Sequence, residues 1–176
     1  MAVELPPGLR RSLSELGASH PLPGVRWLPA ENLHITVVFL GDVADADVDG
    51  LIDALRQAAR LTDPFSLELL HARAAPDRHP RMIWALVSAS EPLLRLSRDL
   101  HGAARRLAPK RRPPRRGFAH ITLARFRSPP PGLQPMPLEA DGGIPVAAVR
   151  LMRSRLSPAG ASYQAVAEIA LGRAPT

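Results

Sequence analysis

Two short segments, one in each half of the chain, share a pattern of histidine, threonine and apolar residues. His34-Ile35-Thr36 lies in the apolar stretch 33–40, and His120-Ile121-Thr122 opens a similar stretch that runs to residue 126. Both stretches are rich in β-branched and aromatic residues, which favour strands. Two such strands in the two halves of a 176-residue chain predict one domain, residues 1–176, built from two pseudo-symmetric lobes.

Strand and helix patterns interleave along the rest of the chain. Apolar residues at helical spacing predict helices over 9–16, ending at Gly17, over 48–59, and over 91–107 with Ser90 as N-cap. The predicted strands are 3–5, 26–28, 33–40, 65–70, 82–87, 120–125, 147–153 and 163–169. This order of elements predicts an α+β or mixed α/β fold.

The two His-x-Thr segments also indicate chemistry. Side chains alternate between the faces of a strand, so His34 and Thr36 point the same way, as do His120 and Thr122. Four apolar side chains of the first strand are expected to point into the core instead: Leu33, Ile35, Val37 and Phe39.

Two imidazoles with pKa values near 6.5 can divide acid and base work between them, and two hydroxyls can hydrogen-bond an anionic oxygen. The pattern therefore suits metal-free cleavage of a phosphodiester, in which one histidine activates water or a ribose hydroxyl and the other protonates the leaving oxygen. A single His-x-Thr strand is more often structural, and the matched second copy favours catalysis.

No metal or other cofactor is expected. The chain has no cysteine, and neither His-x-Thr segment has a third histidine or a carboxylate in its pattern that would complete a zinc or iron site. The chain also has no apolar run of 18 residues, and its N-terminus carries prolines and charges where a signal peptide has an apolar stretch. We therefore expect a cytoplasmic protein that does not enter a membrane.

The net positive charge of the chain comes from one segment. The chain has 23 Lys and Arg against 16 Asp and Glu, a formal net charge of +7. Residues 105–116 hold seven basic residues and no acid, so this segment accounts for the whole excess. Two interpretations stay open: a rim that attracts RNA phosphates, or a solvated loop in an arginine-rich chain.

Several segments resemble the 2H phosphoesterases, and in particular the RNA 2′,3′-cyclic phosphodiesterases, also called 2′-5′ RNA ligase-like proteins. The segments that carry the resemblance are 26–28, 31–36, 39–41, 118–125, 149–154 and 160–163. The resemblance implies a bilobal α+β fold, with two antiparallel β-sheets lining a central V-shaped cleft and helices packed outside. It also implies a monomer that acts without a cofactor on RNA or a nucleotide bearing a 2′,3′-cyclic phosphate.

The same resemblance assigns roles to residues. His34 and His120 would form the acid–base pair that opens the cyclic phosphate to a 2′-phosphate, with His120 favoured as base and the reverse order left open. Thr36, Thr122 and Arg125 would bind phosphate oxygens. Strict alternation places Arg125 on the opposite face from His120, a conflict that a β-bulge, a strand end or a long side chain would remove.

Other functions remain compatible with the sequence. Within the same fold these are 2′-5′ RNA ligation and hydrolysis of a small cyclic phosphate, and outside enzymology an RNA-binding module that uses the cleft and residues 105–116. Phe118 and Tyr163 are candidates for stacking on a base, although such aromatic residues more often belong to a core.

Overall fold

The computed structural model describes residues 1–105, 107, 119–138, 143–157 and 160–172. Of the basic segment 105–116, all but residues 105 and 107 lies outside the described residues, as does Phe118. Antiparallel strands dominate the described part of the chain, together with three α-helices and two short 3-10 helices, η1 (Ala30–Asn32) and η2 (Asp45–Asp47). The α+β class is confirmed.

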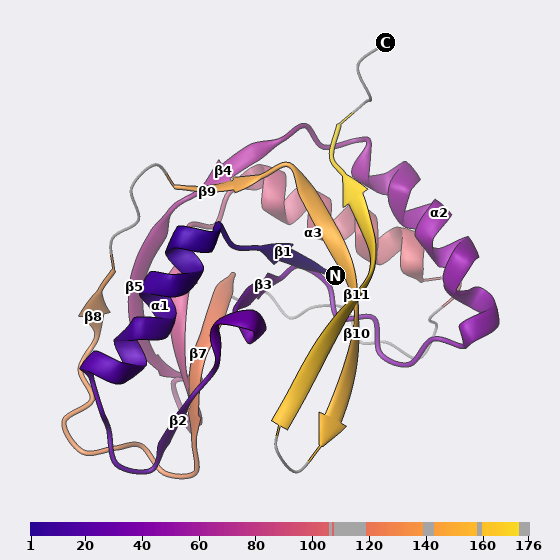
Figure 1. Cartoon of the computed structure of the whole chain (residues 1–176). Helices are drawn as coiled ribbons and strands as arrows, with labels where there is room; N and C mark the ends of the chain where they lie inside the picture. Colours follow the sequence, from indigo (N-terminus) through magenta and orange to yellow (C-terminus); the bar gives the residue numbers. More distant parts are fainter. Residues whose placement is uncertain (106, 108–118, 139–142, 158–159, 173–176) are drawn as a thin grey trace.

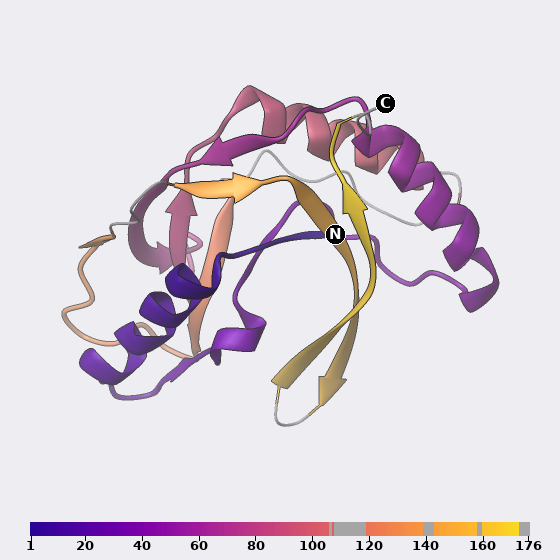
Figure 2. The same cartoon turned by 45° about the horizontal axis from the view of Figure 1, so that its top comes forward.

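Nine strands form one large sheet, in which every neighbouring pair is antiparallel. Their spatial order is β11 (Gly160–Ala170), β10 (Ala148–Ser157), β1 (Ala2–Glu4), β3 (His34–Thr36), β7 (His120–Phe126), β6 (Met82–Val87), β5 (Leu69–Ala75) and β8 (Met136–Pro137), with β2 (Val25–Trp27) paired to β7. A second sheet joins β4 (Phe65–Leu67) to β9 (Ile144–Val146). The two halves of the large sheet diverge from the β3–β7 junction (Figures 1 and 2).

Two of the α-helices cover one side of this sheet. Helices α2 (Val48–Ala59) and α3 (Glu91–Ala104) lie next to each other, and α1 (Pro7–Ser19) lies beside β2 (Figure 2). Fully buried leucines of α2 and α3 face the sheet, among them Leu55 and Leu100. The predicted N-cap of α3 is confirmed, because the Ser90 hydroxyl accepts a hydrogen bond from the Leu93 N–H.

Helix α1 continues past Gly17, where the sequence predicts its end. Gly17 instead lies inside the helix and against Trp27, since a Cβ at this position would lie 2.7 Å from a ring carbon of Trp27. The glycine therefore marks a close approach between α1 and β2 rather than a helix stop.

The predicted strand over 33–40 is shorter than expected. Strand β3 ends at Thr36, and the backbone N–H groups of Val37 and Val38 both reach the carbonyl oxygen of Met1, at 3.0 and 3.3 Å. Alternation stops there, so Val37 and Val38 are both buried while Phe39 is 73% exposed. The prediction that Phe39 points into the core is wrong, because it extended a period of two beyond the end of the strand.

Two further differences concern the second sheet. The predicted strand over 65–70 is two strands separated at Glu68, whose N–H binds the Ser88 hydroxyl at 2.8 Å. Strand β9 is absent from the predictions, since Pro145 interrupts its sequence pattern. None of the helices in the described ranges is long and apolar enough to cross a membrane.

Candidate active site

The two His-x-Thr segments lie side by side at the centre of the large sheet. Ile35 of β3 is the register partner of Ile121 of β7, and both side chains are fully buried. In an antiparallel pair this register makes His34 and Thr122 cross-strand neighbours. Both lie on the face of the sheet that Ile35 and Ile121 do not occupy. Figure 1 shows the two strands meeting between the halves of the molecule.

The same register puts Thr36 opposite His120. The two histidines are therefore diagonal neighbours, a relation that corresponds to about 7–8 Å between strand positions. Both histidines and Thr122 are half-buried and Thr36 is exposed, so the four polar side chains border solvent. Two imidazoles at diagonal positions of one face are close enough to contact the same substrate group.

A β-bulge brings Arg125 to the same face. Along β7, Thr122 pairs with Trp84 of β6, but Ala124 pairs with Ile83 and Arg125 with Met82, so Leu123 is the extra residue of the bulge. Arg125 is exposed on the face that carries Thr122, and its Nη1 lies 3.6 Å from the Met82 sulfur.

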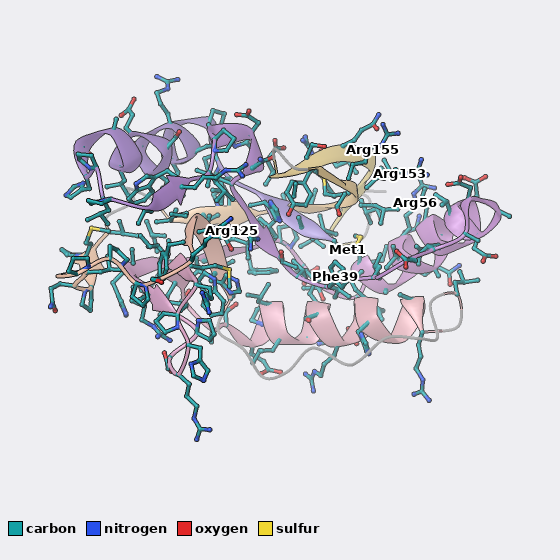
Figure 3. All side chains as sticks on the ribbon, turned by 90° about the horizontal axis from the view of Figure 1, so that it is seen from below. Met1, Phe39, Arg56, Arg125, Arg153 and Arg155 are labelled. Atoms are coloured by element: carbon teal, nitrogen blue, oxygen red, sulfur yellow. The ribbon has the colours of Figure 1, made fainter. Side chains whose placement is uncertain are left out.

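The bulge removes the conflict that strict alternation created. Leu123 and Ala124 are both buried, whereas a regular strand would bury only one of two successive residues. Arg26 of β2 is the register partner of Arg125, so a second guanidinium group comes from a position opposite it. Figure 3 shows the Arg125 side chain on β7.

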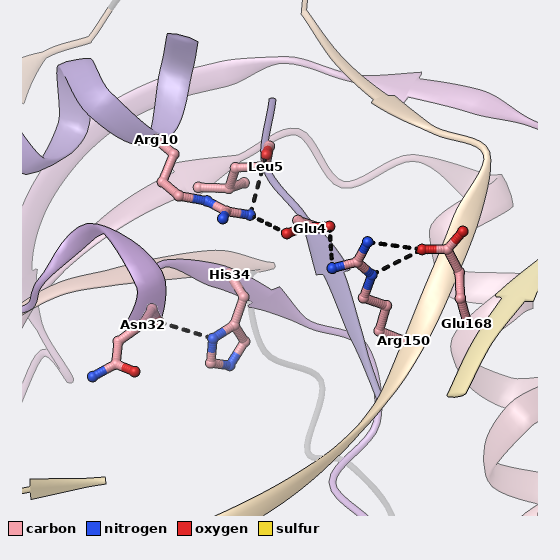
Figure 4. Close-up of polar contacts among 7 residues, drawn as sticks. All are labelled: Glu4, Leu5, Arg10, Asn32, His34, Arg150 and Glu168. Carbon is pink, nitrogen blue, oxygen red and sulfur yellow. Dashed lines mark hydrogen bonds and ion pairs between the residues drawn. The ribbon is translucent and has the colours of Figure 1, made fainter. Parts of the chain in front are cut away.

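A hydrogen bond to the backbone sets the orientation of the His34 ring. Its Nδ1 lies 2.9 Å from the carbonyl oxygen of Asn32 (Figure 4). A carbonyl oxygen only accepts, so Nδ1 carries the hydrogen and Nε2 is the nitrogen left for a substrate. Asn32 is held in turn, because its side-chain amide donates to the carbonyl oxygen of Ala161 at 3.1 Å.

The pKa of His34 is lowered from its ordinary value of 6.5. Burial of the ring is the largest cause, and electrostatic interactions with the Met1 amino group, His120 and Arg10 lower the pKa of His34 further. The hydrogen bond to Asn32 opposes them. At neutral pH the ring is therefore mainly neutral in the ligand-free protein, with a lone pair on Nε2.

Each histidine also has an aromatic neighbour. The ring of Tyr163 meets His34 edge to face, with centroids 4.7 Å apart and planes at 71°. Trp84 stacks on His120, with centroids 3.8 Å apart and planes at 17°. Neither Trp84 nor the position of the Tyr163 ring was predicted as part of the site, because both contacts join strands that are distant in sequence.

An ion-pair network borders the site on the β1 side (Figure 4). Glu4 is the register partner of His34, and its two carboxylate oxygens bind Arg10 at 2.6 Å and Arg150 at 2.5 Å. Arg150 also binds Glu168 at 2.9 Å. The carboxylate opposite His34 in the β1–β3 pair thus already binds two arginines.

The structure therefore gathers all five predicted site residues on one face of the sheet: His34, Thr36, His120, Thr122 and Arg125. Their catalytic and binding roles stay predictions. Within the described ranges, no three histidine, aspartate or glutamate side chains come together as a metal site would require. The face offers two imidazoles, two hydroxyls and a guanidinium group, which is a set of groups that fits a phosphate ester.

The chain is similar to known proteins in sequence and in fold. The family described as LigT like Phosphoesterase matches residues 3–84. An RNA 2′,3′-cyclic phosphodiesterase of Thermus thermophilus is 28% identical over 97% of this chain and 88% of its own length. One of Methanothermobacter thermautotrophicus is 29% identical over 93% of this chain and 92% of its own length.

Solved structures are similar along nearly the whole chain. A crystal structure of a protein of Thermus thermophilus superposes with a TM-score of 0.84 and 30% identity, covering 98% of this chain and 97% of that one. A crystal structure of Escherichia coli LigT with 3′-AMP gives a TM-score of 0.77 and 25% identity, over 98% of this chain and 96% of that one.

Proposed function

This chain belongs to the LigT-like 2H phosphoesterase family, and we propose that it hydrolyses the 2′,3′-cyclic phosphate at an RNA 3′ end to a 2′-phosphate. The observation that carries the proposal is the Ile35–Ile121 register, which puts the histidine and threonine of both segments on one face. The curated relatives that cover most of the chain are named RNA 2′,3′-cyclic phosphodiesterase, which supports this substrate.

The reaction requires one proton to be taken and one to be given. The proposed base, His120, removes a proton from water, and the resulting hydroxide oxygen forms a bond to phosphorus. The bond from phosphorus to the 3′ oxygen breaks, and the proposed acid, His34, gives the proton of its Nε2 to that oxygen. The products are a 2′-phosphate and a 3′-hydroxyl group.

The other three residues stabilise the charge that develops on the phosphate. The hydroxyls of Thr36 and Thr122 donate hydrogen bonds to the two non-bridging oxygens, and the guanidinium group of Arg125 offsets their negative charge. Placement on strands rather than loops keeps these donors in position before the substrate binds.

The lowered pKa of His34 sets a condition on this order of proton transfers. A ring that is neutral in the ligand-free protein must gain a proton before it serves as the acid. The cyclic phosphate is an anion, and a negative charge beside the ring favours the charged imidazole. Substrate binding should therefore take up a proton at His34, whereas the reverse order, with His34 as base and His120 as the protonated acid, needs no uptake at His34.

An assay of turnover and product tests the proposed function. Purified protein in EDTA should open an oligonucleotide that ends in a 2′,3′-cyclic phosphate, and chromatography should identify a 2′-phosphate terminus. His34→Gln and His120→Gln should each lower the rate by about a hundred- to ten-thousandfold, while His20→Gln, at an exposed position, should not.

Each alternative has its own result in this assay. A 3′-phosphate product, or turnover that the chelator abolishes, would contradict the proposed reaction. Joining of a 5′-hydroxyl end through a 2′-5′ bond would identify a ligase, and retention of RNA without any turnover would identify a binding protein.

A further inference from the structure

Asn32 makes two different contacts, one through its backbone and one through its side chain. Its carbonyl oxygen accepts the hydrogen on Nδ1 of His34 at 2.9 Å (Figure 4). Its side-chain amide donates to the carbonyl oxygen of Ala161 at 3.1 Å. The mechanism above uses His34 and assigns no role to the Asn32 side chain.

The side-chain contact joins parts of the chain that are far apart. Asn32 and Ala161 are 129 positions apart in sequence, and Ala161 belongs to β11, the strand at one edge of the large sheet. His34 opens β3, which lies near the centre of the same sheet. The Asn32 amide therefore connects the β10–β11 hairpin to the backbone segment that orients the His34 ring.

Asn32 ends a short element that its own hydrogen bonds hold weakly. The 3-10 helix η1 has three residues, none of them buried, and no side chain caps its N-terminus. The Asn32 N–H binds the carbonyl oxygen of Pro29 at 2.9 Å, but hydrogen bonds of this kind have poorer geometry than those of an α-helix. On one side the chain is fixed by Leu33, which is buried in the core. The bond to Ala161 fixes the other side.

The carbonyl oxygen of Asn32 decides which nitrogen of His34 carries the hydrogen. An imidazole in water favours the tautomer with the hydrogen on Nε2, whereas this carbonyl requires it on Nδ1. The proposed proton transfer takes place at Nε2. Whether His34 acts as acid or as base, its neutral form in that reaction is the Nδ1–H tautomer. The position of the Asn32 carbonyl therefore matters for both orders of proton transfer.

We propose that Asn32 is a positioning residue for His34, and that the bond from its side-chain amide to Ala161 holds the carbonyl oxygen that selects the Nδ1–H tautomer. Without this bond the carbonyl shifts relative to the ring, and the Nε2–H tautomer gains population. The inference rests on the proposed function for its effect on turnover, but not for its effect on the ring. The β10–β11 hairpin thus contributes to the orientation of a histidine that lies on another strand.

Three variants separate the amide group from the rest of the residue. All of them retain the backbone carbonyl, so any effect on His34 comes from its position. Asn32→Leu keeps the branched shape and the neutral charge but removes the donor. Asn32→Gln retains an amide donor on a longer side chain, and Glu31→Gln, at the exposed neighbouring position of η1, is the matched control. Thermal unfolding establishes that each variant folds.

Nitrogen chemical shifts of the imidazole ring measure the tautomer directly. Spectra of isotope-labelled protein are recorded at pH 8 without substrate, and the His34 signals are identified by their absence in His34→Gln. The wild type and Glu31→Gln should show the hydrogen on Nδ1. In Asn32→Leu the ratio of the Nδ1–H to the Nε2–H form should fall by about two- to tenfold, the effect of one neutral hydrogen bond. Asn32→Gln should retain much of the wild-type ratio.

Steady-state kinetics measure the consequence for turnover. With a nucleoside 2′,3′-cyclic phosphate as substrate, Asn32→Leu should lower kcat by about tenfold, since small displacements of a catalytic group have effects of this order. KM should stay within about twofold of the wild-type value, because the groups proposed to bind the phosphate remain. A wild type that shows the expected tautomer and turns over no cyclic phosphate would overturn the proposed function and leave the effect on the ring supported.

Three outcomes would overturn the inference itself. An Nε2–H tautomer in the wild type would contradict the role of the Asn32 carbonyl. An unchanged tautomer ratio in Asn32→Leu would show that the amide does not hold this carbonyl in place. Equal losses of kcat in Asn32→Leu and Asn32→Gln, with the wild-type tautomer ratio in both, would show that Asn32 only supports the fold.

Discussion

The indole ring of Trp84 lies face to face with the imidazole ring of His120, with ring centroids 3.8 Å apart. Trp84 is the register partner of Thr122, which lies two residues after His120 in β7. The contact between Trp84 and His120 is therefore diagonal across the β6–β7 pair. The stack covers one face of the imidazole and restricts its rotation. We therefore expect Trp84 to hold the proposed base in position.

Truncation of this ring should lower kcat more than it changes KM. Trp84→Leu is expected to reduce kcat by about ten- to a hundredfold, since small displacements of a catalytic group have effects of this order. Trp84→Phe keeps an aromatic face and should restore much of the loss. Steady-state kinetics of both variants check this, with thermal unfolding to establish that they fold. Equal losses in the two variants would show that stacking is not the cause.

Removal of the Arg125 side chain should weaken transition-state stabilisation. Arg125→Ala is expected to reduce kcat/KM on the order of a hundredfold, because it removes a cation from the charged phosphate. Arg125→Lys should recover part of the rate, as lysine restores the charge without the two-pronged geometry. Arg127→Ala, an exposed arginine just beyond β7, is the control. Similar losses at both positions would indicate a general effect of charge.

Proton uptake on binding should identify the acid. Calorimetry in buffers of different ionisation enthalpy measures the protons taken up when a nucleoside 2′,3′-cyclic phosphate binds at pH 7. His120→Gln, which lacks the proposed base and retains His34, should take up as much as one proton per substrate. His34→Gln should take up markedly less. Absence of uptake in His120→Gln would assign the base role to His34.

The stability of the protein should fall in mild acid partly because of His34. Its pKa is lowered in the folded protein, whereas in the unfolded chain it returns to about 6.5. As the pH falls below this value, the unfolded state binds the proton first, so the free energy of unfolding decreases.

His34→Gln should remove this contribution. Between pH 7.5 and 5, Tm should fall less in His34→Gln than in the wild type, and His20→Gln should behave like the wild type because His20 is exposed. Parallel loss of Tm in all three proteins would contradict the assignment. Melting curves at a series of pH values supply the measurement.

Much of the fold follows from local patterns in the sequence. Helix α2 and strand β6 have the predicted bounds, and the Ser90 cap of α3 is confirmed, because helical periodicity, alternation and capping are properties of neighbouring residues. The relation between two pseudo-symmetric lobes stays a prediction.

The parts that the sequence could not predict depend on distant contacts. Phe39 is exposed because the strand ends at Thr36, where the backbone N–H groups of Val37 and Val38 bind the carbonyl oxygen of Met1. The stack of Trp84 on His120 needs the register of β6 and β7, which no local pattern contains. The bulge did leave a local sign, since Leu123 and Ala124 are two successive apolar residues where alternation expects one.

The bulge at Leu123 also has a consequence for the stability of the core. In a regular strand Ala124 and Phe126 would face solvent with Thr122, and the guanidinium group of Arg125 would point among the apolar residues behind the sheet. Burial of an unpaired charge there is far more costly than any loss of apolar area. With the register shift, Phe126 is only 7% exposed and Arg125 reaches water. One irregular residue thus keeps a cation out of the protein interior and, in the same step, gives the interior an aromatic ring.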